Sequence, residues 1–200
     1  MKRLIVACVV ILFSSLIGTA LEATPITYKA SLDGIQTVPP TGSLATGFAT
    51  ITADSATHLL TFDLSWSNLA ANPSGLHIHC CALIGANGTL AINFQGFPAA
   101  TSGVYVQTVD LTVSTLYNAM FLTLHGGTAA QAEADLLAGL ASGNAYIDIN
   151  NPAFGAGEIR GQLAAVPEPS TALLLVTGLA SVAALHYKRR RSWPGGGCRF

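Results

Sequence analysis

The chain has 200 residues, the size of one ordinary domain; half of them are apolar and only 10% are charged. This composition excludes a collagen-like fibre, because the 20 glycines follow no period, and a fully disordered chain, which would combine low hydrophobicity with high charge. Residues 24–165 hold two bases, Lys29 and Arg160, against eight acids. Because phosphate binding needs clustered Lys and Arg, we expect no nucleic-acid partner.

The first 23 residues have the order of a secretory signal peptide. A short basic start precedes an apolar run from Leu4 to Ile17, and Ala20 and Ala23 are small residues suited to cleavage. We expect residues 1–23 to form a signal helix that signal peptidase removes. The alternative is an uncleaved membrane anchor, which the shortness of the apolar run disfavours.

Residues 24–165 show the alternation of antiparallel β-strands. Leu60, Phe62, Leu64 and Trp66 alternate with polar residues, so these four side chains should face the core. Turn sequences rich in Pro, Gly and Asn separate the strands. The pattern predicts an all-β domain, an antiparallel β-sandwich with Greek-key-like connections. The other expected strands are residues 28–32, 48–51, 77–79, 104–113, 145–150 and 158–163.

One short helix is expected within this domain. Thr128 has the hydroxyl group of an N-cap, and Gln131, three positions later, completes a capping box. Ala, Glu and Leu fill the segment to Leu140, and Gly143 ends it. We expect the apolar stripe of this helix to close one end of the sandwich.

The C-terminal segment has three parts in order. A Pro-Glu-Pro motif comes first, an uncharged run of 15 residues from Thr171 to Leu185 follows, and a basic cluster comes last. At 1.5 Å per residue the run reaches about 22 Å, short of the ~30 Å core of a bilayer, and flanking side chains can extend it. We expect a C-terminal transmembrane helix with its basic end in the cytoplasm. The motif residues are Pro167, Glu168 and Pro169, and the basic cluster is Lys188, Arg189, Arg190 and Arg191.

These three parts, over residues 166–191, resemble the PEP-CTERM sorting signal. The resemblance implies a Gram-negative bacterium whose exosortase cuts near the Pro-Glu-Pro motif. The precursor would then be anchored in the inner membrane for a time and delivered to the cell surface or the extracellular matrix, where such proteins are associated with biofilm and exopolysaccharide. Family members usually end close to the arginines, whereas this chain continues with residues 192–200, which we expect to be a disordered tail. A plain C-terminal tail anchor is the alternative.

Residues 26–163 resemble the CHRD domain. The resemblance rests on Tyr28–Leu32, on the strand of His77, Ile78 and His79, and most specifically on the closing motif Gly157–Leu163. It implies an extracellular β-sandwich with no established enzymatic activity. Together with the sorting signal, we expect a binding or structural domain whose partners are exopolysaccharide or surface proteins. A late histidine commonly precedes the closing motif in this family, and Asn150 stands in its place.

Two residues of the closing motif, Glu158 and Arg160, are two positions apart and therefore share one face of a strand. We expect Arg160 to pair with a carboxylate, Glu158 or Asp148, and thereby to fix the strand register. Binding of a ligand by Arg160 is the alternative.

His77 and His79 are the densest metal-capable pair. On a strand they point to one face, roughly 6.5–7 Å apart along the backbone. Two imidazoles at this spacing can bind one copper or zinc ion, and His125 is the histidine that we expect as a third ligand. The alternatives are hydrogen-bonded strand histidines without a metal, and general acid–base catalysis. No Ser-His-Asp or Cys-His arrangement supports nucleophilic catalysis, so the sequence predicts no enzyme.

Cys80 and Cys81 are the only cysteines that remain after both ends are removed, because Cys8 and Cys198 lie in those ends. Export places them in an oxidising compartment. Neighbouring Cα atoms are about 3.8 Å apart, below the usual disulfide range of about 4.4–6.8 Å, so a bond between them would form a tight turn. The sequence leaves open a vicinal disulfide, free thiols or thiolate ligands, and intermolecular bonds.

Overall fold

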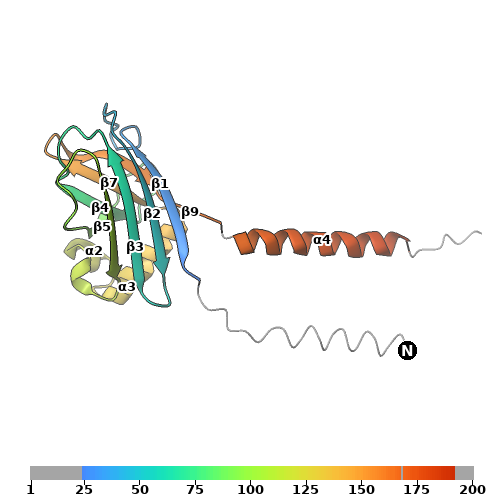
Figure 1. Cartoon of the computed structure of the whole chain (residues 1–200). Coiled ribbons are helices and arrows are strands. Elements are labelled where there is room, and N and C mark those ends of the chain that lie inside the picture. The colour runs from blue at the N-terminus through green and yellow to red at the C-terminus, as the bar shows by residue number, and fades with distance from the viewer. Residues whose placement is uncertain (1–23, 168, 192–200) are drawn as a thin grey trace, which may run out of the picture.

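The structure, a computed structural model, describes residues 24–167 and 169–191 (Figure 1). The expected signal helix (1–23), Glu168 of the Pro-Glu-Pro motif and the tail (192–200) lie outside the described residues. The elements follow in this order: β1 (Ile26–Asp33), β2 (Thr46–Asp54), β3 (Leu59–Ser67), β4 (Gly75–Cys80), β5 (Thr89–Asn93), β6 (Gly103–Asp110), the 3-10 helix η1 (Ser114–Leu116), α2 (Ala119–Leu124), α3 (Ala129–Ala141), β7 (Ala145–Asn151), β8 (Phe154–Gln162), β9 (Ala164–Ala165) and α4 (Pro169–Arg191).

The described strands form one curled, antiparallel sheet in the order β5-β4-β7-β8-β1-β2-β3-β6, with β9 paired to β1. β1 pairs along its whole length with β2, but it meets β8 only at Asp33 and Arg160. The sheet therefore divides into two arms: β5, β4, β7 and β8 form one, and β1, β2, β3 and β6 form the other. The arms fold toward each other as a half-barrel, with α2 and α3 at one end (Figure 1). The sequence analysis predicts two separate sheets; the structure instead has one, because β1 joins both arms.

The core lies between the two arms. Leu60, Phe62, Leu64 and Trp66 are all buried, as the alternation predicts. The ring of Phe62 on β3 stacks on Phe94, just after β5, with centroids 4.4 Å apart. Since β3 and β5 belong to opposite arms, this contact shows that the inner faces pack on each other.

The expected helix is confirmed as α3. Thr128 is its N-cap and accepts a hydrogen bond from the backbone N–H of Gln131. The side chain of Gln131, however, donates to Asp135 one turn later, so the capping box is not reciprocal as predicted. Gly143 adopts a positive φ of 71° just beyond the helix, the left-handed conformation that glycine favours there.

The sequence prediction has errors at several element boundaries. β6 stops at Asp110 instead of Val113, because the Asp110 carboxylate accepts a hydrogen bond from the backbone N–H of Thr112 and turns the chain. β8 begins at Phe154, four residues before the predicted start. The short elements α2, β5 and β9 were not predicted.

The C-terminal segment is helical from Pro169 to Arg191, as expected. Its apolar side chains between Leu174 and Leu185 are exposed. Among the described residues, no helix is long and apolar enough to cross a membrane. The transmembrane part of the prediction is therefore not confirmed.

Candidate functional site

The outer face of β4, β7 and β8 carries a row of polar side chains. Neighbouring residues such as Ile78 and Ile147 point into the core, so the residues that alternate with them point outward. The strand register places His77 of β4 opposite Asp148 of β7, and Asp148 opposite Arg160 of β8. All three side chains are buried or half-buried although they lie on the outer face.

His77, His79 and Asp148 form the candidate functional site. Nδ1 of His77 lies 3.1 Å from Oδ1 of Asp148, and Nε2 of His79 lies 3.4 Å from Oδ2 of the same carboxylate. One ligand atom from each residue lies within 4.8 Å of the other two. In a tetrahedral zinc site, bonds of about 2.0–2.2 Å separate neighbouring ligand atoms by about 3.4 Å. The two histidine–carboxylate contacts are close to this separation, and all three ligand atoms lie near enough to converge on one ion with a small adjustment of the side chains.

The ring of His79 is held in one orientation. Its Nδ1 lies 3.0 Å from the carbonyl oxygen of Gly88, so this nitrogen carries a proton and donates it. In the neutral ring Nε2 then presents a lone pair, and this atom is buried without a hydrogen-bond partner among the described residues. Its 3.4 Å contact with Asp148 is an ion-pair distance. A lone pair that faces a carboxylate requires a cation between them, either a proton or a metal ion.

The pKa values of the two groups shift in the same sense. Burial acts to raise the pKa of Asp148, but its interactions with His77 and His79 outweigh burial and lower it. Burial acts to lower the pKa of His79, but Asp148 and the Gly88 carbonyl outweigh burial and raise it. Both shifts favour an ionised carboxylate beside a positive charge.

Asn150, which stands in the place of the family's late histidine, lies two residues after Asp148 and so on the same face of β7. Its side-chain N–H group donates to the carbonyl of Gly155 at 2.8 Å. Its Oδ1 is buried and, like Nε2 of His79, has no hydrogen-bond partner in the described part of the chain. This face thus carries two buried acceptor atoms that lack a donor.

The structure does not bring His125 to this site. His125 follows the last residue of α2, and its Nδ1 contacts Oδ2 of Asp135 on α3 at 2.8 Å. Its ring also lies against Phe121, with centroids 4.0 Å apart. His125 therefore belongs to the helical end of the half-barrel. Asp148, and not His125, is the third candidate ligand beside His77 and His79.

Arg160 forms an ion pair with neither of the two carboxylates that the sequence analysis named, Glu158 and Asp148. Its guanidinium lies over the ring of Tyr146, with Cζ 3.4 Å from the centroid. Tyr146 lies on β7, between β4 and β8, and its ring also stacks on that of His79, with centroids 4.9 Å apart. Glu158 faces other loops, and no carboxylate oxygen of the described residues lies within 4.0 Å of the guanidinium nitrogens.

Asp148 is the site residue that sequence reasoning assigned differently. The alternation of residues 145–150 already places it on the polar face of its strand, and its carboxylate was expected to pair with Arg160. The missing information was the pairing of β4 with β7, which sets His77 opposite Asp148 across 71 residues of sequence. The sequence contains no local signal for that register.

Most of the chain matches one known protein family. The sequence profile of the CHRD domain matches residues 28–163, more than half of the chain. The chain belongs to the CHRD family. Membership indicates an extracellular or secreted domain that serves binding or structure, in a family that is non-enzymatic. No curated protein and no solved structure matches the chain significantly.

Glu158 of the CHRD closing motif is completely buried and joins two loops to the end of β7. Its carboxylate accepts hydrogen bonds from the hydroxyl group of Ser43 at 2.5 Å, from the backbone N–H of Ala70 at 2.9 Å and from the side-chain amide of Asn151. A buried carboxylate is stable only when such donors surround it. Glu158 therefore holds the loops of the CHRD domain together, a structural role.

Cys80 and Cys81 of the CHRD domain form a vicinal disulfide at the end of β4. Cys81 adopts a positive φ of 77°, and its backbone N–H donates to the carbonyl of Asn144 at 3.0 Å. Gly139 of α3 lies directly against the two sulfur atoms. The helix α3 thus packs against the disulfide. Because the two sulfur atoms are bonded to each other, they are not thiolate ligands of a metal.

Proposed function

We propose that this CHRD protein is an exported binding or structural module of a Gram-negative cell surface or matrix, cut by signal peptidase at its N-terminus and by exosortase near Pro167. The CHRD match over residues 28–163 carries this proposal, because it fills the segment between the two expected address sequences. The same resemblance and the sorting signal make exopolysaccharide or surface proteins the expected partners, with the inner membrane as a transient site.

The arrangement of the chain ends supports this processing. β9 pairs with the start of β1, and the backbone N–H of Val166 donates to the carbonyl of Thr27 at 2.8 Å. Both ends of the folded domain therefore leave it side by side at one edge (Figure 1). Cleavage before residue 24 and after Val166 would remove no core residue.

The test is expression of the full chain in an exosortase-containing Gram-negative host. We expect a mature form at the surface or in the medium, shortened at both ends as seen by mass spectrometry. Changing Pro167, Glu168 and Pro169 together to Ala should leave the precursor in the inner-membrane fraction. The matched control changes Ser192, Trp193 and Pro194 to Ala, outside the motif, and should be processed normally. An unshortened wild-type chain in the cytoplasm contradicts the proposal.

A second function is favoured by the geometry of the candidate site. We infer that His77, His79 and Asp148 bind one zinc or copper(II) ion, for which two imidazoles and a carboxylate are suitable ligands. The cation required between Nε2 of His79 and Asp148 is the observation that supports it. Nδ1 of His79 donates to the Gly88 carbonyl, and metal-binding histidines usually donate their other ring N–H to such an acceptor, which fixes the tautomer and the ring orientation.

Elemental mass spectrometry of the full chain, prepared with copper and zinc available, tests this function. We expect close to one ion per chain in the wild type. His77→Ala, His79→Ala and Asp148→Asn should each weaken binding at least about tenfold, because each removes a ligand from a three-ligand site. His125→Ala is the matched control and should keep the ion. A metal-free wild type would mean that the cation beside His79 is a proton, and loss of the ion in His125→Ala would contradict this ligand set.

A further inference from the structure

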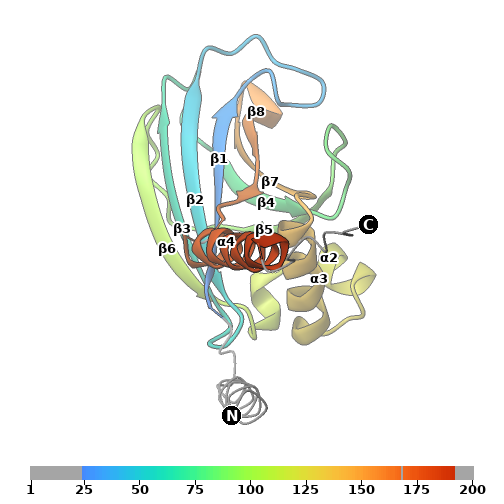
Figure 2. The same cartoon turned by 90° about the vertical axis from the view of Figure 1, so that its right-hand side faces the viewer.

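A cavity of about 380 Å³ lies between two loops on the outer side of β8. One loop joins β1 to β2 and contributes Ile35 and Val38, and the other joins β4 to β5 and contributes Ile84. Figure 2 shows both loops near the upper end of β8. The side-chain amide of Asn87 donates to the carbonyl of Val38 at 2.9 Å and ties the loops together. The volume is within the range of pockets that bind small molecules.

Arg160 contributes the positive charge of this cavity. The side chain is only 3% exposed. Its guanidinium donates to two neutral oxygens, Oδ1 of Asn87 at 3.3 Å and Oε1 of Gln162 at 3.2 Å. Both contacts are longer than a charge-assisted hydrogen bond of about 2.7–2.9 Å. Since a guanidinium has five N–H donors, these two acceptors leave most of its capacity unused.

The charge of Arg160 is also poorly compensated. Burial lowers the pKa of Arg160, with Tyr146 and Asp148 acting in the opposite direction. The carboxylate of Asp148, however, is shared by His77 and His79. An anion at the guanidinium would supply the acceptor that the described residues do not.

Aliphatic side chains form much of the cavity wall, beside a few polar ones. Ile35 is 79% exposed and Ile84 is 72% exposed, so both present their side chains at the mouth. The polar groups of the lining already have partners: the hydroxyl of Thr37 donates to the carbonyl of Gly34, and the amide of Gln36 donates to the carbonyl of Ser31. One cation with spare donors is therefore surrounded by aliphatic surface.

We propose that this cavity binds a small organic carboxylate with an apolar body. The carboxylate accepts hydrogen bonds from Arg160, and the body lies between Ile35 and Ile84. A guanidinium and a carboxylate match in shape and charge, since two parallel N–H donors meet two oxygens. The cavity adjoins the His77–His79–Asp148 cluster, because Arg160 lies over Tyr146 and Tyr146 stacks on His79. The proposal rests on neither a bound metal nor the sorting signal.

Calorimetric titration of the full chain with phenylacetate and with its neutral analogue phenylacetamide tests the charge. The two probes have nearly the same shape and differ in the carboxylate. We expect phenylacetate to bind with a dissociation constant of about 1 mM or lower and the amide at least about tenfold more weakly. Equal binding of the two probes, or no binding of phenylacetate at about 10 mM, overturns the proposal.

Variants at the rim test the location. Ile84→Ser and Ile35→Ser should each weaken phenylacetate binding several-fold, because they remove apolar wall surface. Leu83→Ser is the matched control: Leu83 is in the same loop and 75% exposed but does not line the cavity, so binding should be unchanged. Equal loss in Leu83→Ser and Ile84→Ser would place the ligand elsewhere.

Arg160→Lys tests the guanidinium, and it should weaken binding because a lysine cannot present two parallel donors. If this buried variant does not fold, as judged by circular dichroism, the amide comparison and the rim variants still decide the proposal. Glucuronate tests the apolar body: binding tighter than that of phenylacetate would overturn the assignment of an apolar ligand in favour of an acidic sugar.

Discussion

At the scale of single residues, one buried carboxylate, that of Asp148, connects the polar side chains on the outer face of the sheet. Asp148 contacts the rings of both His77 and His79, and its register partner on the other side is Arg160. Removing only one member of such a buried group leaves the others without compensation, which is costly in free energy. The protonation of His79 and the ionisation of Asp148 are therefore coupled to folding.

This coupling predicts a pH dependence in protein kept metal-free with a chelator. The pKa of Asp148 is lowered, so its contribution to stability is present above the unfolded-state value of about 4 and is lost as the pH falls through the folded value. The pKa of His79 is raised, so its contribution is complete below about 6.5 and is lost as the pH rises through the folded value. The ion pair between His79 and Asp148 therefore contributes fully to stability between about pH 4 and 6.5.

Urea unfolding of the wild type and of Asp148→Asn across this range measures the effect. The difference in the free energy of unfolding should be largest between about pH 4 and 6.5 and should shrink as the pH rises to about 8.5. Asp63→Asn, on an exposed position of β3, is the control and should show no such profile. A difference for Asp148→Asn that stays constant from about pH 5 to 9 argues against the ion pair.

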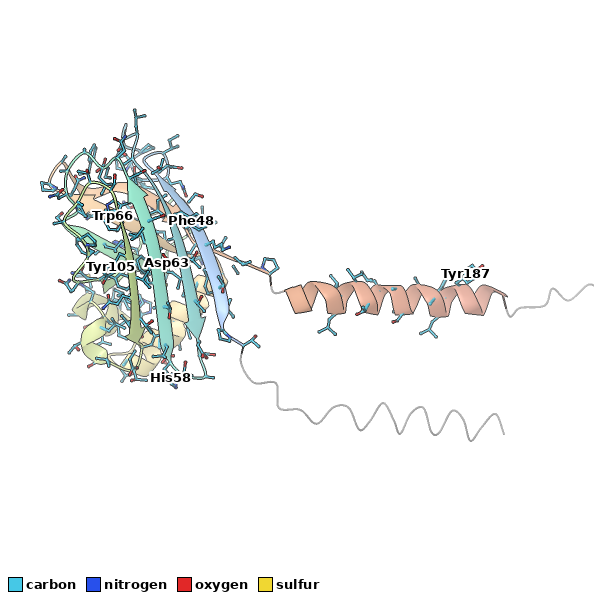
Figure 3. All side chains as sticks on the ribbon, in the orientation of Figure 1. Phe48, His58, Asp63, Trp66, Tyr105 and Tyr187 are labelled. Carbon is cyan, nitrogen blue, oxygen red and sulfur yellow. A yellow bond between two sulfur atoms is a disulfide. The ribbon has the colours of Figure 1, made fainter. Side chains whose placement is uncertain are left out.

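At the scale of elements, contacts from both arms of the sheet hold α3 in place. His58, labelled at the lower end of the sheet in Figure 3, contacts Glu133 of α3 at 2.8 Å. Near the end of the helix, Gly139 approaches the vicinal disulfide so closely that a Cβ atom there would overlap Sγ of Cys80. The two contacts fix the position of the helix and leave no room for a side chain at position 139.

Gly139→Ala should therefore destabilise the domain although alanine is the better helix former. The gain in helix propensity is about 1 kcal/mol, whereas forcing a methyl group into a filled core typically costs about 1–3 kcal/mol and here meets a sulfur held in a ring. We expect the difference of these two terms, a net loss of up to about 2 kcal/mol, in urea unfolding. Ala134→Gly, exposed on the same helix, measures the propensity effect alone and should cost about 1 kcal/mol. A stabilised Gly139→Ala variant would show that α3 can shift away from the disulfide.

At the scale of the whole molecule, the last strand, β9, pairs with β1 at the place where both chain ends leave the domain. β9 adds two pairs to β1, Tyr28 with Ala165 and Lys29 with Ala164. The described side chains of α4 beyond this point are exposed. The folded unit therefore ends at Val166, immediately before the Pro-Glu-Pro motif.

Two truncations of the chain without residues 1–23 test this boundary. Ending the chain after Val166 should change the free energy of unfolding by less than about 0.5 kcal/mol, because the described side chains of α4 are exposed. Ending it after Leu163 deletes β9 and should cost about 1–3 kcal/mol, since each net hydrogen bond contributes about 0.5–1.5 kcal/mol. Equal stability of the two truncated chains would show that β9 does not belong to the domain.

The sequence by itself determined the local structure. Alternation placed Leu60 and Phe62 in the core, Thr128 marked the start of α3, and the spacing of His77 and His79 put both on one face, because these features follow from neighbours in the chain. Only the tertiary structure decided that one curled sheet replaces a sandwich, that Asp148 rather than His125 joins the two histidines, and that Arg160 lies over Tyr146. The physical reason is that strand register is set by pairings between distant segments, and a shift of one residue would turn each of these side chains to the other face.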